Sequence, residues 1–213
     1  MSPQEKTALI LVDIQNDFLE QGSLAVAESN GILDKVNELI TKVKSNHGLV
    51  IATQDWHPSN HISFASNHTD KQVFETKDIE YEGVQVTQMM WPDHCVQGSF
   101  GAEISKTIDL DQVDFIVQKG LNRHVDSYSA FADNNYSEIT PLAKILHRQL
   151  VDKVIIVGLA LDYCVKYTCL DAIKFGFKTI LVVECTKPVD KEQFHATLEH
   201  LKSKGVTIQQ SWL

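Results

Sequence analysis

Short, continuous apolar runs alternate with helical patterns along most of this 213-residue chain. These runs lack the polar–apolar alternation of a strand with one solvated face, so each predicts a strand buried on both faces. Helices between such strands cover the two faces of a parallel sheet. The predicted strands are residues 7–14, 49–53, 115–117, 154–157, 179–183 and 206–208.

The segments between these strands carry apolar residues at helical spacing. Gly48 and Gly176 are suited to ending two of the helices, and Pro141 fits the first turn of another. The sequence therefore predicts a single α/β domain over residues 1–213, a doubly wound parallel sheet with helices on both faces. The predicted helices are residues 32–43, 140–150, 163–175 and a last one around 194–201.

Composition excludes several classes of function. The net charge of −9 argues against a nucleic-acid-binding surface, and no apolar run approaches membrane-spanning length. The first strand follows a short polar segment, so no signal peptide is predicted. The cysteines, at 95, 164, 169 and 185, lack paired-motif spacing and are expected to be free thiols in a reducing compartment. We expect a cytoplasmic protein; nuclear or peroxisomal access and oligomerisation stay open.

Four chemically active side chains fall at or just after predicted strand ends: Asp13, Asp55, Lys119 and Cys164. In parallel sheets, ligands bind beyond the carboxyl ends of the strands, so these residues are expected to converge. Cys164 also begins a helical pattern, where the partial positive charge of the helix end favours thiolate and backbone N–H groups can bind an oxyanion. An isolated free cysteine is more often a small buried hydrophobe, so position alone leaves both readings open.

Residues 54–100 form the one long segment without a clear helical or strand pattern. It is too rich in aromatic residues and histidine for a disordered linker. Asp55 and His57 project to the same side of an extended backbone, and His94 could add a third metal ligand. Such ligands suit Zn²⁺, Fe²⁺ or Mn²⁺, although Asp-x-His pairs also occur by chance. His61 and His68 are expected at the surface or behind the ligands.

The chain resembles the nicotinamidases of the isochorismatase-like cysteine hydrolase superfamily, and the fungal members most. Each motif is modest by itself, but their joint order is specific, and they span nearly the whole length. They are DIQNDF at 13–18, DWHP at 55–58, WPDHC at 91–95, KG at 119–120, YSAF at 128–131 and GLALDYCV at 158–165.

The resemblance implies roles for individual residues. The bond between Leu159 and Ala160 should be cis, aiming the Ala160 N–H with that of Cys164 at an oxyanion. One divalent transition metal is implied, zinc first, with iron or manganese as alternatives; whether His61 binds it is left open. The implied catalytic residues are Asp13, Lys119 and Cys164, the metal ligands Asp55, His57 and His94, and the substrate-binding residues Phe18, Trp91, Tyr128 and Ala160.

The implied activity is the hydrolysis of nicotinamide, and by extension pyrazinamide, through a cysteine thioester in NAD salvage. The alternative is a sibling amidohydrolase acting on another small amide or ureido acid, although siblings generally lack the metal-ligand set. Two readings from other classes are an inactive pyridine-binding module and a metallohydrolase in which metal-bound hydroxide replaces the thiol.

The sequence departs from the family pattern at a few places. Lys187 stands where arginine is usual, and Cys185 has no family role. Residues 73–86 match no motif, so the shape of the outer lid of the site is not predicted.

Overall fold

A six-stranded parallel sheet forms the centre of the computed structural model, which describes residues 5–212. Its strand order is β5-β2-β1-β6-β7-β8, and every neighbouring pair is parallel. The prediction of a parallel sheet is therefore confirmed. The strands are β1 Thr7–Val12, β2 Leu49–Asp55, β5 Phe115–Lys119, β6 Lys153–Leu159, β7 Lys178–Lys187 and β8 Thr207–Gln209.

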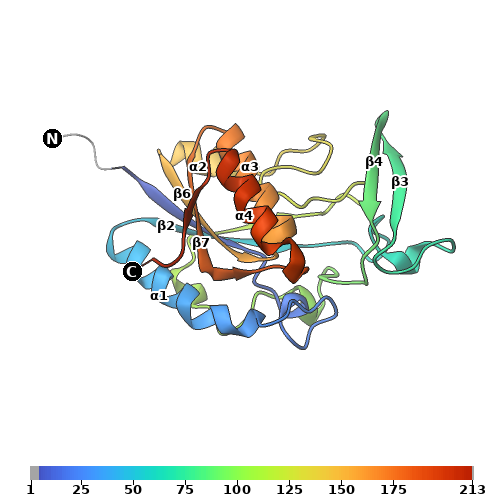
Figure 1. The fold of residues 1–213 in the computed structure, drawn as a ribbon, viewed down its shortest axis with the longest axis horizontal. Coiled ribbons are helices and arrows are strands. Elements are labelled where there is room, and N and C mark those ends of the chain that lie inside the picture. The colour runs from blue at the N-terminus through green and yellow to red at the C-terminus, as the bar shows by residue number, and fades with distance from the viewer. Residues whose placement is uncertain (1–4, 213) are drawn as a thin grey trace.

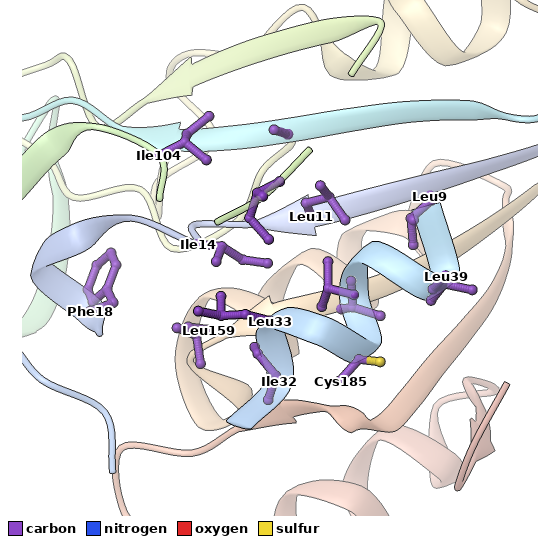
Figure 2. Packing of buried hydrophobic residues seen from close by; sticks show 14 of the residues in the cluster. Leu9, Leu11, Ile14, Phe18, Ile32, Leu33, Leu39, Ile104, Leu159 and Cys185 are labelled. Atoms are coloured by element: carbon purple, nitrogen blue, oxygen red, sulfur yellow. The ribbon is translucent and has the colours of Figure 1, made fainter. Parts of the chain in front are cut away.

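Helices cover both faces of this sheet, with α1 on one side and α2, α3 and α4 on the other (Figure 1). Strand β1 shows why its sequence is apolar throughout. Leu9 and Leu11 pack under α1 in the first core cluster (Figure 2), whereas Ala8 and Ile10 pack in the second cluster with α2 and α3. Removing each such leucine or isoleucine from water contributes about 1.5–3 kcal/mol. The helices are α1 Leu33–Ser45, α2 Leu142–Arg148, α3 Lys166–Lys174 and α4 Phe194–Ser203.

The long segment 54–100 contains an antiparallel hairpin that the sequence analysis did not predict. Strands β3 (Thr76–Tyr81) and β4 (Val84–Met89) are joined by Glu82 and Gly83, both at positive φ as in a two-residue hairpin turn. Ile79 and Gln88 are its only buried residues, so the apolar signal of a strand is weak here. The hairpin stands beyond the end of the central sheet (Figure 1).

No helix in the described part of the chain is long and apolar enough to cross a membrane.

Candidate active site

The carboxyl ends of three parallel strands bring Asp13, Lys119 and Cys164 together. Lys119 Nζ lies 2.9 Å from Asp13 Oδ2 and 3.6 Å from Cys164 Sγ, and all three residues are buried. It also donates hydrogen bonds to Asp55 Oδ1 at 2.5 Å and to the Ser127 carbonyl oxygen at 2.8 Å. The predicted triad is thus one contact group around a single buried ammonium.

Asp13 ends β1 earlier than predicted. Its φ of 49° turns the chain out of the strand after Val12, although the apolar run continues to Ile14. Thr53 on β2 fixes the carboxylate, because its hydroxyl donates to Asp13 Oδ1 at 2.5 Å. Burial raises the pKa of Asp13 to about 6, against the opposing charge of Lys119. A carboxylate with this pKa can accept and return a proton near neutral pH.

Lys119 remains charged in this buried position. Burial by itself would lower its pKa, but the charges of Asp13 and Asp55 raise the pKa well above the ordinary value. The same ammonium holds the pKa of Asp55 well below its usual range, although burial by itself would raise it. Asp55 is therefore an ionised, acceptor-only carboxylate.

Cys164 lies in a π-helical turn, Leu161–Val165, directly between β6 and α3. This agrees with the predicted strand-to-helix position, and the Leu159–Ala160 peptide bond is cis as the resemblance implies. Burial raises the pKa of the Cys164 thiol well above its ordinary value, and Lys119 only partly opposes this. The protonated thiol is therefore favoured in this position, and a base must remove its proton before it can attack.

Gly158 explains how this turn comes so close to Asp13. It has a φ of 117°, and a Cβ at this position would lie 2.1 Å from the carbonyl oxygen of Val12. Only glycine allows the end of β6 to approach the end of β1 this closely.

The predicted metal ligands also converge. Candidate ligand atoms of Asp55, His57 and His94 all lie within 4.8 Å of one another, and the three residues are buried. His57 Nδ1 lies 2.8 Å from the Gly120 carbonyl oxygen, and His94 Nδ1 lies 2.8 Å from that of Pro92. Because a carbonyl only accepts, each Nδ1 carries a hydrogen, and Nε2 is the nitrogen left available to a metal, the arrangement typical of metal-binding histidines.

The contact between His57 and the backbone of residue 120 requires glycine at this position. A Cβ there would lie 2.3 Å from His57 Cε1, and its φ is 66°. The Lys-Gly pair thus supplies the buried ammonium of Lys119 and, directly after it, room for the ring of His57.

His61 adds a further donor, which spacing alone did not resolve. Its Nδ1 lies 2.7 Å from Ser63 Oγ, and its buried Nε2 has no partner among residues 5–212. Burial lowers the pKa of His61 to about 3, and it also lowers that of His94. The pKa of His57 is raised by Asp55, although burial opposes this. The donor set suits a divalent metal, which would displace the His57 proton.

Sequence reasoning missed two polar residues of this region. The Gln15 side chain holds β2 in place, since Oε1 accepts from the Asp55 N–H at 2.8 Å and Nε2 donates to the Asp55 carbonyl at 2.8 Å. Its place inside the DIQNDF motif was a signal. Asp126, buried beside His57 and His61, lies in no motif, and the sequence carried no signal for it.

A narrow pocket, partly open to solvent, lies beside both groups. All four predicted substrate-binding residues line it, and Cys164 and His94 lie on its walls. Its lining is mainly aromatic and apolar, with few polar groups, as is usual for a small-molecule site. The lining residues are Phe18, Leu24, Asp55, Trp91, His94, Asp126, Tyr128, Ala160, Tyr163, Cys164 and Val189.

Fold and site together define an α/β protein with a parallel sheet and a buried thiol at the carboxyl ends of its strands. Comparison with known proteins identifies its family. The family model described as "Isochorismatase domain" matches residues 7–211. The chain therefore belongs to the isochorismatase domain family.

Individual relatives cover nearly the whole chain. A nicotinamidase of Acinetobacter baylyi is 41% identical over 94% of this chain and 88% of its own length. The structure of yeast nicotinamidase bound to the inhibitor nicotinaldehyde matches with a TM-score of 0.89 at 34% identity, covering 95% of this chain and 99% of the other. Pyrazinamidase of Pyrococcus horikoshii in complex with zinc matches with a TM-score of 0.80 at 40% identity, covering 96% and 99%. Similarity thus extends beyond fungal members, with higher identity to the bacterial relative than to the yeast one.

Proposed function

We propose that this protein is a metal-containing nicotinamidase, which hydrolyses nicotinamide to nicotinate and ammonia in NAD salvage. One observation carries the proposal: a single aromatic-lined pocket is lined by both Cys164 and His94, which is a candidate metal-binding histidine. A flat heterocyclic amide can thus meet the thiol at its carboxamide and a metal site at its ring. The nicotinamidases among the relatives support this substrate, and the pyrazinamidase supports pyrazinamide as a second one.

The triad residues would act in sequence. Asp13 takes the proton of the Cys164 thiol, and the sulfur attacks the carboxamide carbon. Lys119 lies beside both groups and stabilises the negative charge that the attack creates. The carbonyl oxygen becomes an oxyanion, which the backbone N–H groups of Ala160 and Cys164 would bind. One such donor typically contributes about 10²–10³ in rate.

The proton then returns through Asp13. Protonated Asp13 gives it to the departing nitrogen, the C–N bond breaks, and ammonia leaves a thioester on Cys164. Asp13 next takes a proton from a water molecule, which attacks the thioester carbon. Nicotinate leaves, and the thiol is restored with the Asp13 proton, so no cofactor is consumed.

We also propose that Asp55, His57 and His94 hold one divalent transition metal, with the Nε2 of His61, unpartnered among residues 5–212, as a fourth donor. Zinc suits these nitrogen and carboxylate donors and is named for the Pyrococcus horikoshii relative; iron or manganese are the alternatives. When bound, the metal supplies a Lewis-acidic position for the ring nitrogen. Phe18, Trp91 and Tyr128 would hold the ring beside it.

A panel of three amides tests the substrate proposal. Nicotinamide and pyrazinamide both carry a ring nitrogen meta to the carboxamide and should be hydrolysed. Benzamide, which lacks it, should have a kcat/KM lower by about 10²-fold or more, because a polar site left without its partner discriminates strongly. The measurement is ammonia release, with the deficit expected to shrink in His57→Ala. Comparable values for benzamide and nicotinamide would contradict ring-nitrogen coordination; hydrolysis of none of the three amides would contradict the proposed function.

Metal removal should affect both activity and the long segment between the ligands. Asp55 and His57 lie near its start and His94 near its end, so one ion ties both ends together. Elemental analysis should find one divalent transition metal per chain. Chelation should lower activity and increase amide hydrogen exchange in residues 55–94, with little change in β6 and α3. Active protein without stoichiometric metal would contradict the site.

A further inference from the structure

Gln88 is a buried polar residue that the reaction sequence above does not use. It lies on β4 of the hairpin, and its side chain is only 1% exposed, although most of this strand faces solvent. Its Nε2 lies 2.9 Å from Asp126 Oδ2, 2.8 Å from the Met89 carbonyl oxygen and 3.2 Å from Tyr128 Oη. The side-chain amide of Gln88 thus connects the hairpin to two residues that line the cavity.

The orientation of this amide is determined by its surroundings. The three neighbours of Nε2 are all oxygen atoms, and a carboxylate and a carbonyl among them can only accept hydrogen bonds. The opposite orientation would turn Oε1 toward these oxygens and lose both bonds. Oε1 is buried without a partner in the described part of the chain, so the donor contacts must outweigh that unsatisfied acceptor.

Asp126 and Tyr128, the two side chains that accept hydrogen bonds from Gln88, both line the cavity. The carboxylate of Asp126 lies between two N–H donors, Gln88 Nε2 and the Ser127 backbone N–H at 2.8 Å. Tyr128 Oη accepts from Gln88 and, at 3.3 Å, from Trp91 Nε1. Without Gln88, Asp126 would lose one of its two hydrogen-bond donors, and its carboxylate, which lies within 4.8 Å of candidate ligand atoms of His57 and His61, would be less firmly held.

We propose that Gln88 is a positioning residue for substrate binding, which fixes the Asp126 carboxylate and the Tyr128 hydroxyl and so sets the shape of the ring pocket. The inference rests on the proposed function, because it concerns how the amide substrate is held. Gln88 makes no hydrogen bond to Asp13, Lys119 or Cys164, whose partners come from the central sheet and from Ser127. Its loss should therefore raise KM far more than it lowers kcat.

Two substitutions at this position give graded outcomes. Gln88→Met keeps the length and removes the N–H donors, and KM for nicotinamide should rise about tenfold, with kcat within about threefold of the parent, as for loss of a hydrogen bond to a charged group. Gln88→Glu places a carboxylate against Asp126, and KM should rise further. Gln85→Met is the matched control, because Gln85 lies on the same strand but is exposed and bonds to Glu80. Its KM should equal that of the parent.

A second readout separates positioning from general damage. Alkylation of Cys164 without substrate should proceed at the parent rate in Gln88→Met, whereas protection by nicotinamide should require about tenfold more ligand. In an Asp126→Ala background, the further change Gln88→Met should have a smaller effect, because the two residues act through one contact.

An unchanged KM in both Gln88 variants would overturn the inference, and so would equal losses in kcat and KM. Loss of the folded state in both would contradict it too, by making Gln88 a structural residue. Each KM of a variant is compared with the KM of the parent protein, so the test of Gln88 requires a parent that hydrolyses nicotinamide. If the parent does not hydrolyse nicotinamide, the proposed function itself is contradicted, and this result is distinct from failure of the inference on Gln88.

Discussion

Replacing Cys164 with alanine should lower kcat by about 10⁴-fold or more while the protein stays folded, as is typical when a covalent nucleophile is removed. The thiol is the only sulfur that contacts Lys119 and lies on the cavity wall among the described residues. Ammonia release measures the loss, and circular dichroism with the thermal midpoint measures the fold. Cys185→Ala is the matched control, because Cys185 is equally buried but packs in the core under α1 (Figure 2).

Alkylation of the parent protein gives an independent check of the same residue. Cys164 should be modified first, because it alone among the described cysteines faces the cavity, and nicotinamide should protect it. Full turnover by Cys164→Ala would rule out the covalent mechanism and favour attack by metal-bound hydroxide. Full activity after alkylation of Cys164, with no protection of the thiol by nicotinamide, would also rule out the covalent mechanism.

Replacing Lys119 with methionine should lower kcat/KM by about 10³-fold, since the change removes the charge that stabilises the intermediate. It should also destabilise the fold by about 3–5 kcal/mol at neutral pH, because Asp13 and Asp55 would remain buried without their cation. Ammonia release and urea unfolding measure the two effects. Lys153→Met, which changes a partly exposed lysine at the opposite end of β6 from the site, should leave both values near those of the parent.

The pH dependence of the two proteins should differ in a defined direction. In the parent, kcat/KM should rise with pH through about 6, because Asp13 must be ionised to act as a base and burial raises its pKa to about 6. Lys119 lowers that pKa, so its removal should move the acid limb to higher pH. A raised folded-state pKa favours the folded state at low pH, and this benefit is lost as pH rises through the folded value. The variant should therefore regain stability relative to the parent as pH falls. An unchanged acid limb would contradict the role of Asp13 as the base.

The sequence alone determined the fold class and the residues that meet in the site. Apolar runs such as residues 7–12 predict strands buried on both faces, and parallel strands between helices place their carboxyl ends at one edge. The convergence of Asp13, Lys119 and Cys164 follows from that rule before any coordinates are known. Motif order then implied the ligand group Asp55, His57 and His94, whose candidate ligand atoms lie within 4.8 Å of one another in the structure.

Tertiary structure alone decided the hairpin and the polar wall that it supports. Residues 76–89 bury almost only Ile79 and Gln88, so their hydrophobic pattern gives little signal, and their position depends on contacts with distant residues. Asp126 belongs to no motif, and its burial beside His57 follows only from how the loop after β5 packs. The sequence alone also did not predict the pKa shifts of the buried groups. Whether Cys164 is a thiol or a thiolate depends on burial opposed by Lys119, and a linear sequence contains neither the burial nor the 3.6 Å distance that decides the balance.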